Sequence, residues 1–296
     1  MISTINYLYA TLVAVAAKII YDLIYKYKSI PSQVGKSVWI IGASSGIGKA
    51  VAKDYYLSGA NVTISSRRQD ALDTVKSEFE ALKPNATNKI FVVPLDIEQI
   101  DTFEDKTKQV EIQMGQIDIL VMSSGLGIRS NSRDVKQEIE DKVMNTNFRG
   151  PVALAKIVLN GMRSRKQGNL VFISSIQGLL SVPARACYCA AKHALQGYCD
   201  ALRAEEKKNG IHIMVVSPAY VKTNHSLSAV TGDGKTYGKM DKTTEKGMSP
   251  EQLSHDIIFG IKHNKYNLIN APIWMKAYLL LGSILQFEPL GLRKPL

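Results

Sequence analysis

Short apolar runs alternate with stretches of helical periodicity along most of the chain. The runs are rich in β-branched residues and are bounded by turn-forming residues, so each is predicted to be a strand. Helical stretches separate them, for example up to Ser58 and from Asp70 to Leu82. This alternation is typical of βαβ units, in which helices cover both faces of a parallel sheet. The predicted strands span residues 37–42, 61–65, 89–95, 117–122, 169–173 and 211–216.

One α/β domain with a doubly wound parallel sheet is predicted over residues 31–272, because no repeat or linker interrupts the pattern. Within it, residues 226–247 are polar and lack a strand period, which is typical of a lid or binding loop. Residues 273–296 begin with an apolar stretch. This tail is interpreted as a terminal helix closing a pocket, the surface of a homodimer, or a second membrane contact.

The N-terminus has a different character from the rest of the chain. From Ile2 to Ala17 there is no charged side chain, and apolar residues continue to Ile24. A spanning helix needs about 20 apolar residues, so residues 1–30 are predicted to be a hydrophobic membrane anchor. Lysines follow this stretch, which predicts that the domain after it faces the cytosol. The alternative is an amphipathic helix packed on the body of the protein or on a partner.

Composition narrows the class of protein. Of 296 residues, 45% are hydrophobic and 21% charged, which suits a globular domain with a sizeable core. The net charge of +11 is spread along the chain without a nucleic-acid-binding motif, so a solvated basic surface or membrane proximity is expected, and no nucleic acid. Three cysteines, an odd number, indicate reduced thiols rather than a disulfide framework. We predict no metal site.

A glycine-rich turn follows the first predicted strand. Glycines at positions 42, 46 and 48 stand where the strand passes into a helix, and they permit a tight turn with close approach of a pyrophosphate. The helix N-terminus supplies free N–H groups and positive potential. We therefore predict a Rossmann-type dinucleotide site rather than a bare structural turn. Its predicted phosphate-binding residues are Gly42, Ser44, Ser45, Gly46, Ile47 and Gly48.

The end of the second predicted strand indicates which dinucleotide binds. An enzyme specific for NAD places a carboxylate there for the ribose 2′-hydroxyl, whereas a 2′-phosphate requires a cation. This strand ends in Ser66, Arg67 and Arg68, with no acid. Ser66 and Arg67 are therefore predicted to bind the 2′-phosphate of NADP(H). The alternative is two solvated arginines that open a helix.

A tyrosine and a lysine stand four residues apart in a predicted helix. Tyr188 and Lys192 thus lie on one face, and Ser175 ends the preceding strand, at the sheet edge where ligands bind. Reduction of a ketone needs a proton donor at oxygen, and a nearby cation brings the pKa of a phenol towards the working range. These three are the predicted catalytic residues. The alternative is a Tyr and a Lys on a packed helix.

From Ser37 to Ala271 the chain resembles the short-chain dehydrogenases/reductases. The resemblance rests on the glycine turn and on Tyr188-x-x-x-Lys192, with Ser175 thirteen residues before the tyrosine. It implies that Tyr188 is the general acid/base and that Ser175 orients the substrate. It also implies that Lys192 tunes Tyr188 and binds the nicotinamide ribose.

Further positions follow from the same resemblance. Asn147 matches an asparagine that holds a water molecule in a proton relay, and Asp96 matches a residue that contacts adenine. Pro218, Val221 and Thr223 match the segment that lies against the nicotinamide carboxamide. With the turn residues, Tyr188 and Lys192, they complete the predicted cofactor site.

Three segments depart from the family pattern. Ile41 replaces a threonine, Met122–Gly125 replaces Asn-Asn-Ala-Gly, and Ala219 replaces a glycine. The first two changes remove polar groups that tie the central strands to the turn, and are expected to affect local rigidity and cofactor affinity.

The loop and the N-terminus resemble the membrane-anchored member 7 group of this family, of the B type. The loop motifs are Ala229–Gly234, Tyr237-Gly-x-Met240 and Ser249-Pro250. The resemblance implies a membrane of the endoplasmic reticulum or peroxisome and reduction of an acyl dihydroxyacetone phosphate. The loop lysines would suit a phosphorylated headgroup, or else lie on a solvated surface: Lys235, Lys239, Lys242 and Lys246.

The leading hypothesis is an NADP(H)-dependent oxidoreductase that interconverts a ketone and a secondary alcohol on a lipophilic substrate. Acyl-glycerone phosphates, steroids and retinoids all suit an anchored enzyme. A catalytically weak or inactive cofactor-binding scaffold at a membrane is the alternative, and a basic membrane-surface binding protein is a third hypothesis.

Overall fold

The computed structural model describes Val13 and residues 30–285. The chain divides into two units between Pro31 and Ser32, and the fold that follows is that of the second unit. Apart from Val13 and Ile30, the predicted anchor over residues 1–30 lies outside the described residues. Within the described part of the chain, no helix is long and apolar enough to cross a bilayer.

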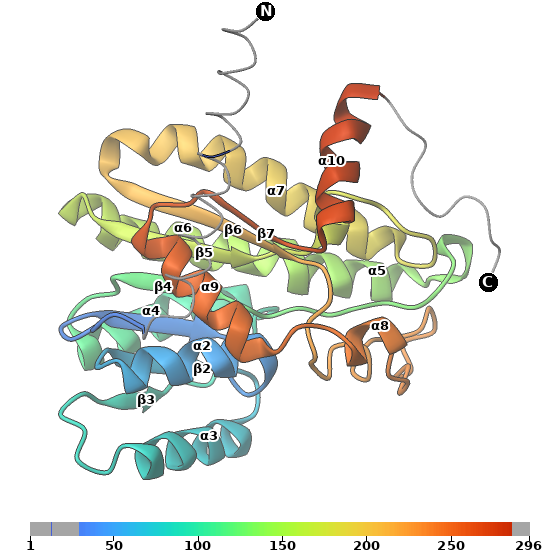
Figure 1. The fold of residues 1–296 in the computed structure, drawn as a ribbon. Coiled ribbons are helices and arrows are strands. Elements are labelled where there is room, and N and C mark those ends of the chain that lie inside the picture. The colour runs from blue at the N-terminus through green and yellow to red at the C-terminus, as the bar shows by residue number, and fades with distance from the viewer. Residues whose placement is uncertain (1–12, 14–29, 286–296) are drawn as a thin grey trace, which may run out of the picture. The chain divides into compact units, whose positions relative to one another are not determined.

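Seven parallel strands form one sheet in the order β3-β2-β1-β4-β5-β6-β7 (Figure 1). The chain winds outward from β1 in one direction and, after crossing to β4, outward in the other, as in a doubly wound sheet. The predicted fold class is thereby confirmed. The strands are β1 (Ser37–Ile41), β2 (Asn61–Ser65), β3 (Ile90–Val92), β4 (Ile119–Met122), β5 (Gly168–Ile173), β6 (Ile211–Pro218) and β7 (Asn267–Asn270).

Helices cover both faces of the sheet, because the central strands are apolar on both sides. All five residues of β1 are buried. Trp39 and Ile41 belong to an apolar core shared with α4, α6 and α7. Strand alternation turns Val38 and Ile40 to the opposite face, where α2 packs with α3 and α9. The helices are α2 (Gly46–Leu57), α3 (Gln69–Leu82), α4 (Phe103–Met114), α5 (Gln137–Met144), α6 (Gly150–Arg165), α7 (Ala186–Glu206), α8 (Lys242–Glu245), α9 (Pro250–Lys262) and α10 (Ile273–Leu285).

The third strand is shorter than predicted. It covers Ile90–Val92 rather than residues 89–95. The chain still runs beside β2, since the N–H of Leu95 donates to the Ser66 carbonyl at 3.0 Å. Pro94 has no N–H to donate, so the regular ladder ends before it.

The strand β7 was missed by the sequence prediction. Its sequence, Asn-Leu-Ile-Asn, is too short and too polar to give a strand period, and none of its four residues is buried. It pairs with β6 at the edge of the sheet, from Asn267 to Asn270. Pairing with a neighbouring strand, rather than its own pattern, makes it a strand.

A buried relay of hydrogen bonds links β1 and β2 to the residue that follows β3. Trp39 Nε1 donates to Ser65 Oγ at 2.8 Å, and Ser65 Oγ donates to the Val93 carbonyl at 2.6 Å. All three residues are fully buried. Ser65 therefore gives hydrogen-bond partners to the Trp39 N–H and the Val93 carbonyl, which water does not reach.

We predict that Ser65→Ala destabilises the fold by about 1–3 kcal/mol, because it leaves the Trp39 N–H and the Val93 carbonyl without partners in the core. The measurement is thermal unfolding without cofactor. Ser66→Ala is the matched control, since the Ser66 hydroxyl is buried with no hydrogen-bond partner among the described residues. Equal melting temperatures for the two variants would contradict the role of the relay.

Candidate active site

A cavity of about 750 Å³ opens at the carboxyl ends of the strands. It lies where the chain crosses from β1 to β4, the position at which doubly wound sheets bind ligands. Most of the predicted site residues line it: Gly42, Ser44, Ser45, Gly46, Ile47, Arg67, Asp96, Ser175, Tyr188, Lys192, Pro218, Val221 and Thr223. Gly48, Ser66 and Asn147 do not lie on its wall.

The glycine turn is shaped by contacts that exclude side chains. Gly42 has a φ of +80°, and a Cβ there would lie 2.8 Å from the backbone of Ser123. A Cβ on Gly48 would lie 2.3 Å from the Gly42 carbonyl oxygen. These glycines let β1, α2 and the segment after β4 meet at one point.

The N-terminus of α2 faces the cavity through this turn. Ser45 is its N-cap, yet its side chain makes no capping hydrogen bond, and the first turn holds no acid. N–H groups at a helix N-terminus that no side chain caps, with positive potential behind them, fit a pyrophosphate. The residues present therefore suit a dinucleotide.

The end of β2 presents a cation and no acid to the same cavity. Arg67 and Arg68 line it, and both are exposed. Ser66 contributes a hydroxyl that has no hydrogen-bond partner among the described residues. Asp96, also on the wall, accepts from the N–H of Glu98 at 3.1 Å.

The catalytic candidates lie at the other end of the cavity. Tyr188 is in the first turn of α7 and only 7% exposed. Ser175 follows β5, and its Oγ accepts from the N–H of Gln177 at 3.1 Å. Its own hydroxyl hydrogen remains available to the Tyr188 oxygen or to a ligand oxygen beside it, and this polar interaction lowers the pKa of Tyr188.

Lys192 is one helical turn beyond Tyr188 and 3% exposed. Its Nζ donates to the Ile173 carbonyl at the end of β5, at 2.9 Å, and lies 5.7 Å from the Tyr188 ring centroid. Burial lowers the pKa of Lys192 to about 8. The lysine is therefore a cation near neutral pH, fixed by the sheet beside the phenol.

The pKa of Tyr188 differs in direction from the sequence expectation. Burial is the largest effect and raises it above the usual value for tyrosine. The hydrogen bond with Ser175 opposes this most strongly, followed by the cation of Arg185. Burial stabilises the neutral form, so the phenol keeps its proton in the protein alone.

Asn147 is fully buried, in a turn of π-helix (Asn145–Arg149) between α5 and α6. Its amide nitrogen donates to the carbonyls of Leu126 and Val143, at 2.9 and 2.8 Å, and its oxygen accepts from Leu126 N–H. The side chain thus fixes the segment after β4. Its place in a proton relay stays a prediction.

The segment that departs from the family pattern also lies at the site. Ser123, Ser124 and Gly125 line the cavity. The N–H of Ser123 donates to the Ile41 carbonyl at 2.9 Å, so the backbone still joins β4 to the turn. Ser124 adds a hydroxyl that no described residue partners.

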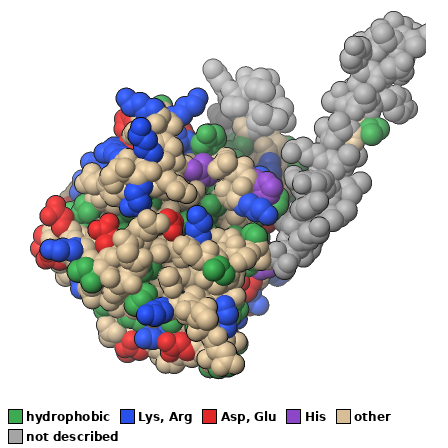
Figure 2. All heavy atoms as spheres, turned by 90° about the vertical axis from the view of Figure 1, so that its left-hand side faces the viewer, with side chains coloured by type: hydrophobic (Ala, Val, Ile, Leu, Met, Phe, Trp, Pro, Cys, Tyr) green, Lys and Arg blue, Asp and Glu red, His purple; other side chains and the backbone are tan. Residues whose placement is uncertain are grey.

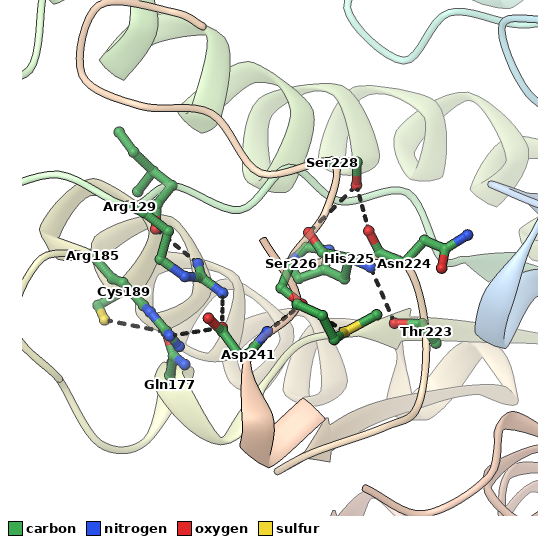
Figure 3. A network of polar contacts seen from close by, with 12 residues as sticks. Arg129, Gln177, Arg185, Cys189, Thr223, Asn224, His225, Ser226, Ser228 and Asp241 are labelled. Carbon is green, nitrogen blue, oxygen red and sulfur yellow. Dashed lines mark hydrogen bonds and ion pairs between the residues drawn. The ribbon is translucent and has the colours of Figure 1, made fainter. Parts of the chain in front are cut away.

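Sequence reasoning missed a polar network beside Tyr188, shown in Figure 3. Arg129 and Arg185 both pair with the carboxylate of Asp241, Arg185 at 3.2 Å. His225 lies in the same region, its ring centroid 5.8 Å from that of Tyr188. These residues come from separate segments with no common motif, so no local signal was available.

The loop of residues 226–247 forms part of the cavity wall through Val230, Gly234 and Thr236. Its lysines do not: none of the four lines the cavity, and Lys235 pairs with Asp233 at the surface, at 2.8 Å. On the face drawn in Figure 2, Lys and Arg side chains are likewise interspersed with Asp and Glu. The loop lysines therefore lie at the surface, outside the cavity, and their binding of a phosphorylated headgroup stays a prediction.

Known proteins resemble the chain over most of its length. A family model described as short chain dehydrogenase matches residues 36–233. The dehydrogenase/reductase SDR family protein 7-like of Anopheles gambiae is 38% identical over 244 residues, which are 82% of this chain and 77% of that protein. The dehydrogenase/reductase SDR family member 7B of Xenopus laevis is 36% identical over 254 residues, 85% of this chain and 79% of that protein.

The fold is also found among solved structures. A short chain dehydrogenase/reductase from Burkholderia phymatum, in complex with NAD, superposes with a TM-score of 0.76 at 17% identity. The superposition covers 91% of this chain and 99% of that one. At this identity the likeness concerns the fold.

Burial of His225 generates a prediction about acid stability. Burial, reinforced by the cations of Lys192 and Arg129, lowers its pKa to about 4, whereas an unfolded histidine titrates near 6.5. Between these values the unfolded chain binds more protons, so stability is complete above about pH 6.5 and falls as the pH drops towards 4. Between about pH 6.5 and 4, we expect the melting temperature of His225→Gln to fall less than that of the unaltered protein. The matched control is His193→Gln, on exposed α7 surface; an unchanged acid dependence in His225→Gln would contradict the assignment.

Proposed function

We propose that this chain, which belongs to the short-chain dehydrogenase/reductase family and to its member 7 group, is an NADP(H)-dependent oxidoreductase that interconverts a ketone and a secondary alcohol. One observation carries the proposal. A single cavity joins a glycine cradle for a dinucleotide to Ser175, Tyr188 and Lys192. The two parts that the reaction needs, a cofactor site and a proton donor, thus share one space.

Reduction adds a hydride to the carbonyl carbon and a proton to its oxygen, and a bound nicotinamide supplies the hydride. Tyr188 delivers the proton from its hydroxyl to that oxygen. Ser175 holds the same oxygen by a hydrogen bond, since its hydroxyl is already oriented by the Gln177 N–H. In the alcohol-to-ketone direction, Tyr188 takes the proton back.

The protonation states suit these roles. Because burial raises the pKa of Tyr188, the phenol holds a proton to donate at neutral pH. Lys192, held by the Ile173 carbonyl, stabilises the tyrosinate left after donation. The cations of Arg129 and Arg185 act in the same direction.

Preference for NADP(H) is supported by the end of β2. Arg67 lies on the cavity wall, and no acid follows the strand to bind a ribose 2′-hydroxyl. A guanidinium pairs with a phosphate through parallel charge-assisted hydrogen bonds. The hydroxyl of Ser66, next to Arg67, is buried behind the cavity wall and has no hydrogen-bond partner among the described residues, and we propose that it turns to the same phosphate when the cofactor binds.

The proposed substrate is a lipophilic ketone or alcohol of the acyl-glycerone phosphate, steroid or retinoid type. Proposed surroundings are a membrane of the endoplasmic reticulum or peroxisome, with the catalytic domain in the cytosol and anchorage through the N-terminus. Ile273 and Trp274, at the start of α10, are 82% and 56% exposed, and support contact with a membrane or a second copy in a homodimer.

A weakly active or inactive cofactor-binding scaffold is the second candidate. The altered segment from Met122 to Gly125 favours it, because polar groups at these strand ends normally fix the site. The complete set of Ser175, Tyr188 and Lys192 weighs against it. Oxidation of NADPH in the presence of an acyl-glycerone phosphate, a ketosteroid and retinal distinguishes the two.

We predict that Tyr188→Phe lowers kcat by about 10²- to 10⁴-fold, since it removes the proton donor while keeping the ring. Binding of NADPH, followed by its fluorescence, is expected to persist. Tyr198→Phe, on the same helix but packed against Phe148, is the matched control. Turnover by Tyr188→Phe at the rate of this control would exclude the proposed mechanism.

We predict that Arg67→Ala raises KM for NADPH about ten- to a hundredfold, through loss of charge-assisted hydrogen bonds to the 2′-phosphate. KM for NADH is expected to stay the same, because NADH lacks that phosphate. Steady-state kinetics with both cofactors measure the difference. Equal changes for the two cofactors would reject Arg67 as the residue that selects NADP(H).

A further inference from the structure

The imidazole of His225 lies on the cavity wall beside the catalytic tyrosine. The ring centroids of His225 and Tyr188 are 5.8 Å apart, with the ring planes inclined at 52°. The close-up in Figure 3 shows His225 within the segment of residues 223–228 that passes the site. A molecule that contacts Tyr188 in this cavity therefore meets His225 as well.

The ring is held in place without using its nitrogens. The backbone N–H of His225 donates to Thr223 Oγ1 at 3.4 Å, and its carbonyl accepts from Ser228 Oγ at 3.3 Å. Gly127 leaves room for the imidazole, since a Cβ there would lie 3.0 Å from Nε2, and Gly125 lies next to it, where a Cβ would make an ordinary contact of 3.8 Å with Cε1. No described residue forms a hydrogen bond with either ring nitrogen. A polar ring that is packed but unpartnered on a cavity wall is a binding group for a ligand.

The charges around the ring decide which ligand atom it meets. Lys192, Arg129 and Arg185 are the cations that face it, and Asp241 is the carboxylate. With Tyr188 neutral, the surroundings carry an excess of positive charge, which favours electron-rich oxygen atoms of a ligand. Burial keeps the imidazole itself neutral at physiological pH, so it presents one N–H donor and one acceptor nitrogen.

We propose that His225 is a substrate-binding residue, whose imidazole N–H donates a hydrogen bond to an oxygen atom carried next to the reacting carbonyl. The inference rests on the proposed function and refines its substrate class. The ketones that bind best carry a hydroxyl, ether or ester oxygen on the carbon adjacent to the carbonyl. Ketones with hydrocarbon on both sides cover the half-buried imidazole without pairing with it and bind more weakly, because desolvating a polar group without giving it a partner costs free energy.

The test compares two ketones of the same shape. Hydroxymethyl octyl ketone carries the adjacent oxygen, and ethyl octyl ketone has a methyl group in its place. Binding is measured by saturation-transfer NMR and calorimetry in the presence of NADP⁺, which has no hydride to transfer. We expect the unaltered protein to bind the hydroxyketone about tenfold more tightly, the effect of one buried hydrogen bond.

Three variants test whether His225 causes the preference for the hydroxyketone. His225→Leu keeps the bulk without the donor and is expected to bind both ketones equally. His225→Gln restores a donor and is expected to recover part of the preference. His193→Leu, an exposed histidine on α7, is the control and is expected to retain all of it.

The outcomes separate this inference from the proposed function. Equal binding of the two ketones by the unaltered protein, an undiminished preference in His225→Leu, or no binding of either ketone overturns the role of His225. Hydride transfer from NADPH to the same ketones tests the oxidoreductase function independently. If the protein prefers the hydroxyketone through His225 but does not reduce either ketone, the oxidoreductase function is rejected and the role of His225 in binding still stands.

Discussion

The backbone contact between the glycine turn and the segment after β4 is the constraint on which the site depends. A side chain at position 42 has no room, because Ser123 occupies that space. The contact brings together the carboxyl ends of β1 and β4, the two strands between which the winding direction changes. Everything that lines the cavity is then arranged around this point, with α2 on one side and Ser175 and α7 on the other.

Burial and charge together determine the chemistry at the far end of the cavity. Burial keeps Tyr188 protonated and lowers the pKa of Lys192, while partial desolvation and the neighbouring cations lower the pKa of the half-buried His225. Three cations surround these groups, and one carboxylate, Asp241, partly balances them. An environment of this kind stabilises negative charge that develops on a substrate oxygen or on the phenolate, and it does so with groups already fixed by the fold.

The long loop after β6 contributes to the site in a way its composition did not indicate. Its lysines lie at the surface, whereas a single acid, Asp241, fastens it to Arg129 after β4 and to Arg185 before α7. A β-bridge between Ile128 and Val230 also joins this loop to the segment after β4. The loop is thus held against the end of the cavity that contains Tyr188 and Ser175, where it completes the wall.

Local sequence patterns predicted six of the seven strands, the glycine turn and the pairing of Tyr188 with Lys192 on one helix face. These depend on short-range patterns, a period of two in strands and a spacing of four in a helix, which local sequence records. It did not reveal β7, whose pairing with β6 makes it a strand, nor the raised pKa of Tyr188, which follows from burial. Arg129, Arg185, His225 and Asp241 meet only because the folded chain brings three distant segments together: those after β4, before α7 and after β6. Their contacts and their desolvation are properties of three-dimensional packing, and no spacing along the chain encodes them.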